Sequence, residues 1–273
     1  LRGGSAVQLT STETYLRRFD ISYLDRLTPD LFVDSVVGRS RAEITGFYFQ
    51  SLRSGEPAGT TPLVLPFAEY TYIPDHKIYG GRLKIDTSAL VLTRSEGTDM
   101  YRGSVSGDWL RLFVTPGGQL FTAEMLARGD LYHIDDARSS MPTAPDNSEN
   151  IGRGLGFAAI EWRWPMVSDA VFANTDFVVE PIAQLVAATQ GGNPAGLPNE
   201  DRTGSEFDET NLFSPNELPG LDLWTGGSRS NLGVRVTAFL PHGSIETTLG
   251  EDFRTEPDPN FAPGSGLGGE RSD

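Results

Sequence analysis

The sequence predicts an all-β fold built from long antiparallel strands. Hydrophobic and polar residues alternate with a period of two, which places them on opposite faces of a strand. The chain of 273 residues holds 31 glycines and 18 prolines, too many interruptions for a helical bundle. Turn-forming stretches such as residues 115–118 separate the alternating segments. Together these features indicate about ten or eleven strands.

The alternating segments follow one another along the chain with two kinds of connection. The expected strands cover residues 6–21, 31–50, 63–73, 81–93, 100–114, 119–134, 156–167, 177–188, 231–240 and 244–253. Short turns rich in Pro and Gly lie at 115–118 and 241–244, whereas long polar connections cover 135–152 and 191–227. Residues 256–273 are rich in Pro, Gly and charge and are expected to form a loop.

The segment from residue 83 shows the pattern clearly. Leu83, Ile85 and Val91 belong to one face, and Lys84 and Asp86 belong to the other. A strand with this pattern has one apolar side and one wet side. We therefore expect each strand to separate an apolar environment from a polar one.

Three other segments carry full charges in the middle of their polar faces. The candidate polar-face residues, which would face the lumen of a barrel, are Glu124, Arg128, Asp130, Glu161, Arg163 and Arg235. The candidate apolar-face residues, which would face lipid, are Ala123, Met125, Ile160, Trp162, Val234 and Val236.

Two architectures produce strands with one apolar face: a soluble sandwich or barrel, and a transmembrane barrel. Three features favour the membrane. The strands reach the nine to eleven residues that a tilted membrane crossing needs. Their apolar faces use Ala, Thr, Gly and Val more than a packed soluble core would. Aromatic residues gather near strand ends, as in residues 47–49 and 162–164, where interfacial girdles are expected. The fold class we predict is a section of a large antiparallel outer-membrane β-barrel.

Composition excludes several functional classes. The chain has no cysteine, which rules out disulfides, Cys-ligated zinc, iron–sulfur clusters and thiol nucleophiles. The net charge of -15 argues against binding nucleic acid, because affinity for phosphate backbones depends on clustered Lys and Arg. We expect no nucleic-acid partner.

No enzymatic or metal site is expected. His76, His133 and His242 lie far apart, in no motif with a second ligand. Residues 152–156 lack the spacing of a phosphate-binding loop and lead into a strand instead of a helix, so no cofactor site is expected. A glycosidase would need two carboxylates close together, and the candidates are Glu124, Asp130, Glu161 and Glu180. The alternative, which we favour, is a charged wall neutralised by Arg128 and Arg163.

An acidic run between the later strands also invites a metal hypothesis. It consists of Glu200, Asp201, Glu206, Asp208 and Glu209. Carboxylate oxygens suit Ca²⁺ or Mg²⁺, but the run does not match an EF-hand. A solvated loop is the favoured interpretation.

Several strings of the sequence resemble the LPS-assembly protein LptD family, also called organic solvent tolerance protein, in its alphaproteobacterial form. They comprise residues 80–99, 115–119, 161–165, 180–186, 198–201 and 207–213, and residues 219–222. The most specific part is a loop motif of Asn211, Leu212, Phe213, Pro219, Gly220, Leu221 and Asp222. The resemblance runs in order from about residue 15 to residues 264–267.

The resemblance implies a protein of the Gram-negative cell outer membrane that assembles lipopolysaccharide there. Such a barrel is fused to a periplasmic jelly roll and plugged by the lipoprotein LptE. Lipopolysaccharide arrives over a bridge of related jelly rolls of the LptA type and enters the outer leaflet between the first and last strands. Residues 1–273 would be a central part of this barrel, with the jelly roll and the gate strands outside it. No step is enzymatic. A secreted polysaccharide-active β-sandwich enzyme and a general porin section are the alternatives.

One position departs from the family pattern. Family members commonly continue with Arg after the residues matching 219–222, and this chain has Leu223. We hypothesise that Asp222 and Arg229 pair across this loop.

Overall fold

The computed structural model describes residues 1–136, 148–172, 175–194, 196–201, 211–218, 220–258 and 260, and the side chains of these residues except 169–172. The all-β prediction is confirmed, since the regular structure of this part of the chain is almost entirely antiparallel strand. The strands are β1 (Arg2–Ala6), β2 (Arg26–Leu27), β3 (Asp30–Val37), β4 (Ser40–Tyr48), β5 (Gln50–Ser51), β6 (Leu63–Tyr72), β7 (Arg82–Thr93), β8 (Asp99–Val114), β9 (Leu120–Asp135), β10 (Ser148–Arg163), β11 (Met166–Phe172), β12 (Thr175–Ala188), β13 (Gly227–Leu240) and β14 (Gly243–Arg254). The helices are α1 (Tyr15–Arg18) and the 3₁₀ turn η1 (Ala58–Thr60).

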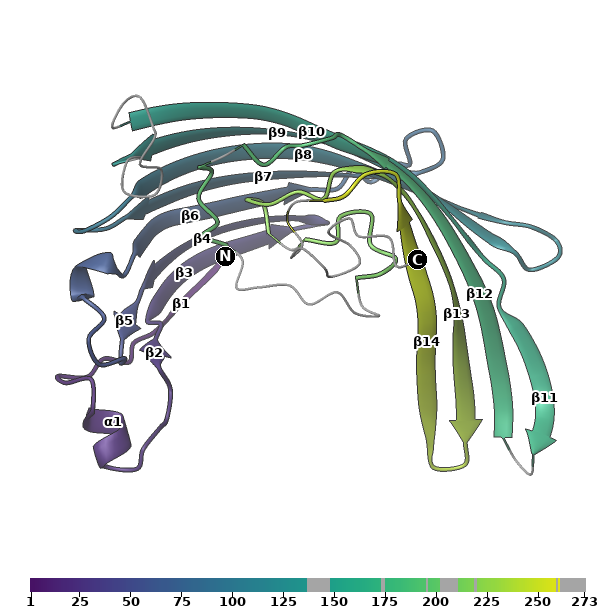
Figure 1. Ribbon diagram of the computed structural model, residues 1–273, viewed down its shortest axis with the longest axis horizontal. Coiled ribbons are helices and arrows are strands. Elements are labelled where there is room, and N and C mark those ends of the chain that lie inside the picture. Colours follow the sequence, from purple (N-terminus) through teal and green to yellow (C-terminus); the bar gives the residue numbers. More distant parts are fainter. Residues whose placement is uncertain are drawn as a thin grey trace. The chain divides into compact units, whose positions relative to one another are not determined.

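Twelve of the strands form one sheet in which neighbours in space are neighbours in the chain. Its order is β1-β3-β4-β6-β7-β8-β9-β10-β12-β13-β14, with β11 paired to β12. β2 and β5 form a separate pair, which lies with α1 beyond the ends of β3 to β6 (Figure 1). The sheet is therefore a meander, the topology of an up-and-down barrel wall.

The chain divides into two compact units. The first consists of Leu1–His76, Lys84–Gly107 and Arg128–Gly154. The second consists of Lys77–Leu83, Asp108–Ala127 and Leu155–Asp273. Strands β8, β9 and β10 each have 16 residues, nearly three times the usual strand length, so they contribute residues to both units.

Most expected strands lie within a few residues of their predicted positions. The predictions for β6, β7, β8, β9, β12 and β14 differ from the structure by at most two residues at either end. β13 begins at Gly227, four residues before its predicted start. The strong alternation explains this agreement, because one face of each strand must differ chemically from the other.

Three other predicted segments, residues 6–21, 31–50 and 135–152, need correction. A strand over residues 6–21 is wrong, since β1 ends at Ala6 and residues 15–18 form α1. The rings of Tyr15 and Phe19, with centroids 4.9 Å apart, contact each other in a tilted arrangement at helical spacing. Residues 31–50 hold a hairpin, with Gly38 at φ 60° in its turn. The loop predicted over 135–152 is too long, because β10 already begins at Ser148.

The predicted strand over residues 156–167 is interrupted at Pro165. β10 pairs with β12 through Phe157–Arg163, and β11 pairs with the same strand through Met166–Phe172. Proline has no N–H to donate to a sheet ladder, so the strand breaks there and resumes along the same neighbour. The Trp164 N–H still donates to the Pro181 carbonyl at 3.2 Å.

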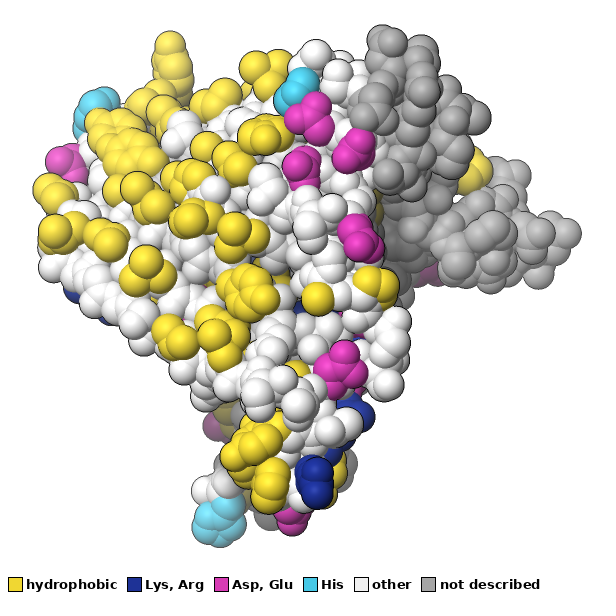
Figure 2. All heavy atoms as spheres, turned by 90° about the vertical axis from the view of Figure 1, so that its left-hand side faces the viewer, with side chains coloured by type: hydrophobic (Ala, Val, Ile, Leu, Met, Phe, Trp, Pro, Cys, Tyr) yellow, Lys and Arg dark blue, Asp and Glu magenta, His cyan; other side chains and the backbone are white. Residues whose placement is uncertain are grey.

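Exposed hydrophobic side chains cover one face of the sheet in each unit. Examples in the first unit are Leu31, Ile44 and Leu131, and in the second Leu185 and Leu249, each more than half exposed. Figure 2 shows hydrophobic side chains spread over the side of the molecule drawn there, with Lys and Arg near its lower end. A surface of this kind marks contact with lipid or another apolar partner. In the described residues, no helix is long and apolar enough to cross a membrane.

Candidate functional site

The register of the second unit aligns side chains into rows across neighbouring strands. Ile160, Leu185, Ser230 and Phe253 form one row, and Glu161, Gln184, Asn231 and Asp252 form the next. Because adjacent residues of a strand point to opposite faces, the first row lies on an apolar face and the second on a polar face. This polar face is the candidate functional site.

The strand pairing shows which of the predicted residues share a face. In the second unit, Ile160, Trp162, Val234 and Val236 share the apolar face, and Glu161, Arg163 and Arg235 share the polar face. In β9, Ala123 and Met125 belong to one face and Glu124, Arg128 and Asp130 to the other. On the apolar face, the Trp162 indole N–H donates to Gln119 Oε1 at 3.1 Å.

Three of the four candidate carboxylates, those of Asp130, Glu161 and Glu180, are paired with arginines, whereas Glu124 lies near the carboxylates of Asp108 and Glu161. Asp130 accepts from Arg128 Nε at 3.1 Å and from Arg153 Nε at 2.7 Å, and its side chain is fully buried. Glu161 pairs with Arg163 at 2.6 Å, and Glu180 pairs with Arg235 at 3.5 Å. This arrangement fits the neutralised wall favoured from the sequence.

A segment between β12 and β13 docks on the polar face of the second unit. We call residues 211–218 and 220–226 the docked segment. The Gln184 amide donates to the Phe213 carbonyl at 2.7 Å, and the Asn231 amide donates to the Leu212 carbonyl at 2.6 Å. Asn231 also donates to Gln184 Oε1 at 3.0 Å. The polar row therefore provides hydrogen-bond donors to backbone carbonyls of the docked segment that would otherwise be buried without a partner.

Trp224 anchors the other end of the docked segment in a small apolar cluster. Its side chain is 1% exposed and packs with Leu155, Phe157 and Val186. The indole N–H donates to the Thr189 carbonyl at 3.1 Å. Asn193 bonds both the N–H and the carbonyl of Trp224, at 2.9 and 2.7 Å. These contacts combine burial of a large aromatic ring with complete use of its polar groups.

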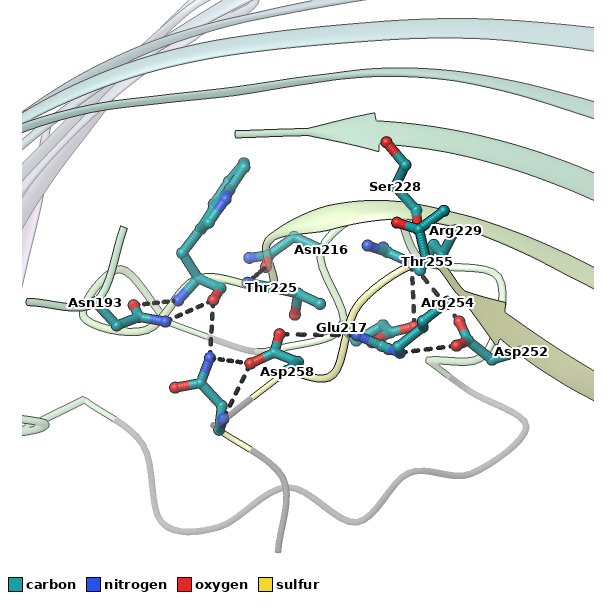
Figure 3. A network of polar contacts seen from close by, with 12 residues as sticks. Asn193, Asn216, Glu217, Thr225, Ser228, Arg229, Asp252, Arg254, Thr255 and Asp258 are labelled. Atoms are coloured by element: carbon teal, nitrogen blue, oxygen red, sulfur yellow. Dashed lines mark hydrogen bonds and ion pairs between the residues drawn. The ribbon is translucent and has the colours of Figure 1, made fainter. Parts of the chain in front are cut away.

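A buried ionic network joins the docked segment to the beginning of β13 and the end of β14 (Figure 3). We call Glu217, Arg229, Asp252, Arg254 and Asp258 the ionic latch. Arg229 Nε lies 3.2 Å from Glu217 and 3.8 Å from Asp252. Arg254 contacts Glu217, lies 2.7 Å from Asp252 and lies 3.7 Å from Asp258.

The ionic latch is almost completely withdrawn from water. Its five side chains are at most 7% exposed. Arg229 also donates to the carbonyls of Ser214 and Pro215, at 3.0 and 2.5 Å. Burial raises the pKa of Glu217 above its ordinary value, and the two arginines oppose that shift. Two arginines face three carboxylates here, so the arrangement depends on nearly complete pairing.

The loop motif seen in the sequence builds the base of the docked segment. Asp222 accepts from the backbone N–H groups of Glu200 and Asp201, at 2.8 and 3.2 Å. Asp201 in turn accepts from those of Leu221 and Asp222, at 2.8 and 3.3 Å. We call Asp201 and Asp222 the aspartate clamp. Pro219 lies outside the described residues.

Gly220 is required beside the aspartate clamp. It has φ 86°, and a Cβ there would collide with the Asp201 carboxylate. The hypothesis that Asp222 pairs with Arg229 is wrong. Asp222 is committed to the backbone at 200–201, while Arg229 pairs with Glu217 and Asp252.

Part of the acidic run considered as a metal site lies within the described residues. Glu200 and Asp201 belong to the acidic run, and Asp201 bonds backbone N–H groups. Glu206, Asp208 and Glu209 lie outside the described residues. Among the described residues no group of three or more His, Asp or Glu side chains could hold a metal ion.

Sequence reasoning missed the residues that hold the docked segment. Alternation around Arg229, Asn231, Asp252 and Arg254 was a usable signal for their face, because each has a neighbour on the apolar side. Their partners were not predictable, since Glu217 precedes Arg254 by 37 residues and no periodic pattern links them.

The comparisons with known proteins agree with this architecture. No curated protein matches the chain. The family model described as LptD, LPS transport system D, matches residues 1–273, the whole chain. Proteins of this family assemble lipopolysaccharide in the outer membrane of Gram-negative bacteria, and the family is one of transport proteins, not of known enzymes. The two-faced antiparallel sheet and the family match lead to one conclusion: the chain belongs to the LptD family.

Proposed function

We propose that the polar face lines the passage for the hydrophilic part of lipopolysaccharide and that the apolar face meets membrane lipid. The observation that carries this proposal is the pair of adjacent rows, Ile160 to Phe253 and Glu161 to Asp252. Lipopolysaccharide joins acyl chains to charged sugars, so its carrier needs a polar surface and an apolar one separated by a single strand thickness. In this proposal the chain is a section of the barrel wall in a Gram-negative outer membrane.

Arginines of the polar face supply the cations that lipopolysaccharide phosphates require. The net charge of -15 would repel an anionic lipid, so local cations must act. Arg163 and Arg235 are 38% and 30% exposed, unlike the buried arginines of the ionic latch. Each arginine is paired with a glutamate on the same face. A phosphate of the lipid can therefore replace the glutamate carboxylate as the partner of the arginine.

The docked segment narrows the polar side of this passage in the second unit. Its contacts with Gln184, Asn231 and Arg229 hold it against the wall instead of letting it extend into solvent. We further propose two protein partners that the family match implies only in general terms. They are a plug lipoprotein of the LptE type and a periplasmic bridge of the LptA type.

The face assignment is tested by placing an arginine on each face of β9. Ala123→Arg should impair barrel assembly by about 2–4 kcal/mol near the midplane, and less toward the interface, because a charge would enter hydrocarbon. Thr122→Arg, at the neighbouring position on the polar face, should impair barrel assembly only mildly. Val236→Arg and Thr237→Arg form a second matched pair in β13. The measurement is the fraction of full-length protein that migrates as folded barrel on electrophoresis without boiling. Equal tolerance on the two faces would overturn the proposal.

A further inference from the structure

A hollow opens on the apolar face of the first unit. It has a volume of about 460 Å³ and is bordered by Ala89, Tyr101, Gly103, Leu131 and Gly152. This volume falls within the range of small-molecule sites, about 300–1,000 Å³. The hollow is continuous with the apolar face that meets lipid in the proposed function.

Glycines create this hollow. A Cβ at Gly103 would have no atom within 4 Å, and a Cβ at Gly152 would meet only Leu131 Cδ2 at 3.5 Å. The space therefore results from missing side chains, with no close backbone approach that would demand glycine there. Leu131 beside it is 71% exposed and offers a wall for an apolar chain.

Polar side chains border one end of the hollow, on the same face of three strands, and we call them the polar margin. In β8, β9 and β10, Tyr101, His133 and Asn150 lie two residues beyond Gly103, Leu131 and Gly152, respectively. Two residues of a strand span about 6.6 Å, so apolar lining gives way to polar groups within one side-chain spacing.

The polar margin is linked across its strands. His133 Nδ1 lies 2.9 Å from Asn150 Oδ1, and His133 Nε2 lies 3.3 Å from Asp135. The ring of Tyr101 is 5.7 Å from that of His133.

We propose that this hollow and its polar margin bind one glycolipid molecule, with an acyl chain over Gly103 and Gly152 and sugar hydroxyls on the margin. The site is a fixed position on the outer wall, separate from the polar face. Sugar hydroxyls donate hydrogen bonds to carboxylate and amide oxygens, and the side chains of Asp135 and Asn150 supply such oxygens. A lipid whose head group carries no hydroxyl groups offers these oxygens no such donors. Tyr101 adds an aromatic ring next to His133 in the margin.

The site rests on the proposed function, because the apolar face must lie in lipid for any acyl chain to reach it. The test uses the full-length protein in outer membranes, with a photoreactive benzophenone side chain in place of Leu131. A second protein carries the same group in place of Ile44, which is 55% exposed on the apolar face outside the hollow. Adducts are separated and probed for lipid A and for phospholipid.

The decisive variant fills the hollow. Gly103→Leu should lower the lipid A adduct at position 131 about tenfold, equivalent to about 1.4 kcal/mol of binding. Gly107→Leu is the matched control, since Gly107 lies on the same strand and face, has open space around its Cβ and does not line the hollow. It should leave the adduct unchanged. Asn150→Leu, which keeps the hollow and removes a margin oxygen, should lower lipid A more than phospholipid.

The outcomes separate the two proposals. If position 131 captures the same lipids as position 44, or if Gly103→Leu leaves its lipid A adduct unchanged, the glycolipid site is refuted while the face assignment stands. Loss of lipid A and phospholipid in equal proportion also refutes the glycolipid, because the hollow would then accept any acyl chain. If neither position captures lipid, the apolar face does not meet the membrane, and the proposed function fails with it.

Discussion

At the scale of single residues, ion pairs on the polar faces differ mainly in burial. Several join residues two apart on one strand, as in Lys84–Asp86 and Arg128–Asp130, because such side chains point to the same face. Asp86 is 33% exposed, whereas Asp130 is fully buried and pairs with two arginines. Ion pairs of similar chemistry should therefore contribute very different free energies to the stability of the barrel at Asp86 and at Asp130.

Removing each aspartate tests this difference. Asp130→Ala leaves Arg128 and Arg153 buried without this partner and should destabilise the barrel by about 3–5 kcal/mol. Asp86→Ala removes a solvent-screened pair and should cost about 1 kcal/mol or less. The measurement is the temperature at which the folded barrel loses its fast electrophoretic mobility. Similar losses in the two variants would show that burial does not set the strength of these pairs.

At the scale of elements, the docked segment depends on the ionic latch more than on its own conformation. It has no regular strand or helix among its described residues, and its backbone groups bond to Gln184, Asn231 and Arg229. A segment of this kind is stabilised by what it touches, so loss of one buried contact should release it locally.

Glu217→Ala is expected to release the docked segment while the strands stay paired. Arg229 and Arg254 would lose their shared carboxylate in a buried site, at about 3–5 kcal/mol. Limited chymotrypsin digestion should then cleave near Leu212 or Phe213. Glu256→Ala, which removes an exposed carboxylate two residues from Arg254, is the control and should stay resistant. Resistance in both variants would mean that the ionic latch does not hold the segment.

At the scale of the whole molecule, the alternation of faces was predictable because it follows from covalent geometry. The side chains of Ile160 and Glu161 must point to opposite faces whatever their partners. The hairpin within residues 31–50 also had a signal, since apolar residues shift from odd positions at Leu31 and Val33 to even positions at Ile44. The parity change marks Gly38 as a turn.

The docked segment was not predictable in the same way. Trp224 stands in a stretch without periodic hydrophobicity, and nothing local indicates that Leu155 and Phe157 will cover it. The partners of Arg229 depend on the register of β13 with β14, which a single sequence does not determine. Polar residues held by tertiary contacts therefore escape pattern-based reasoning, although their faces do not.

The aspartate clamp has a consequence for how this protein family can diversify. It ties residue 201 to residue 222, and the docked segment is held from Leu212 onward, so residues 202–210 connect two anchored points. Doubling the length of such a connection costs only about 0.6 kcal/mol in loop entropy. An epitope tag inserted after residue 205 should leave lipopolysaccharide export intact, whereas the same tag between Ser214 and Pro215 should abolish it. Length differences between homologues are accordingly expected to concentrate at 202–210, between these two anchored points.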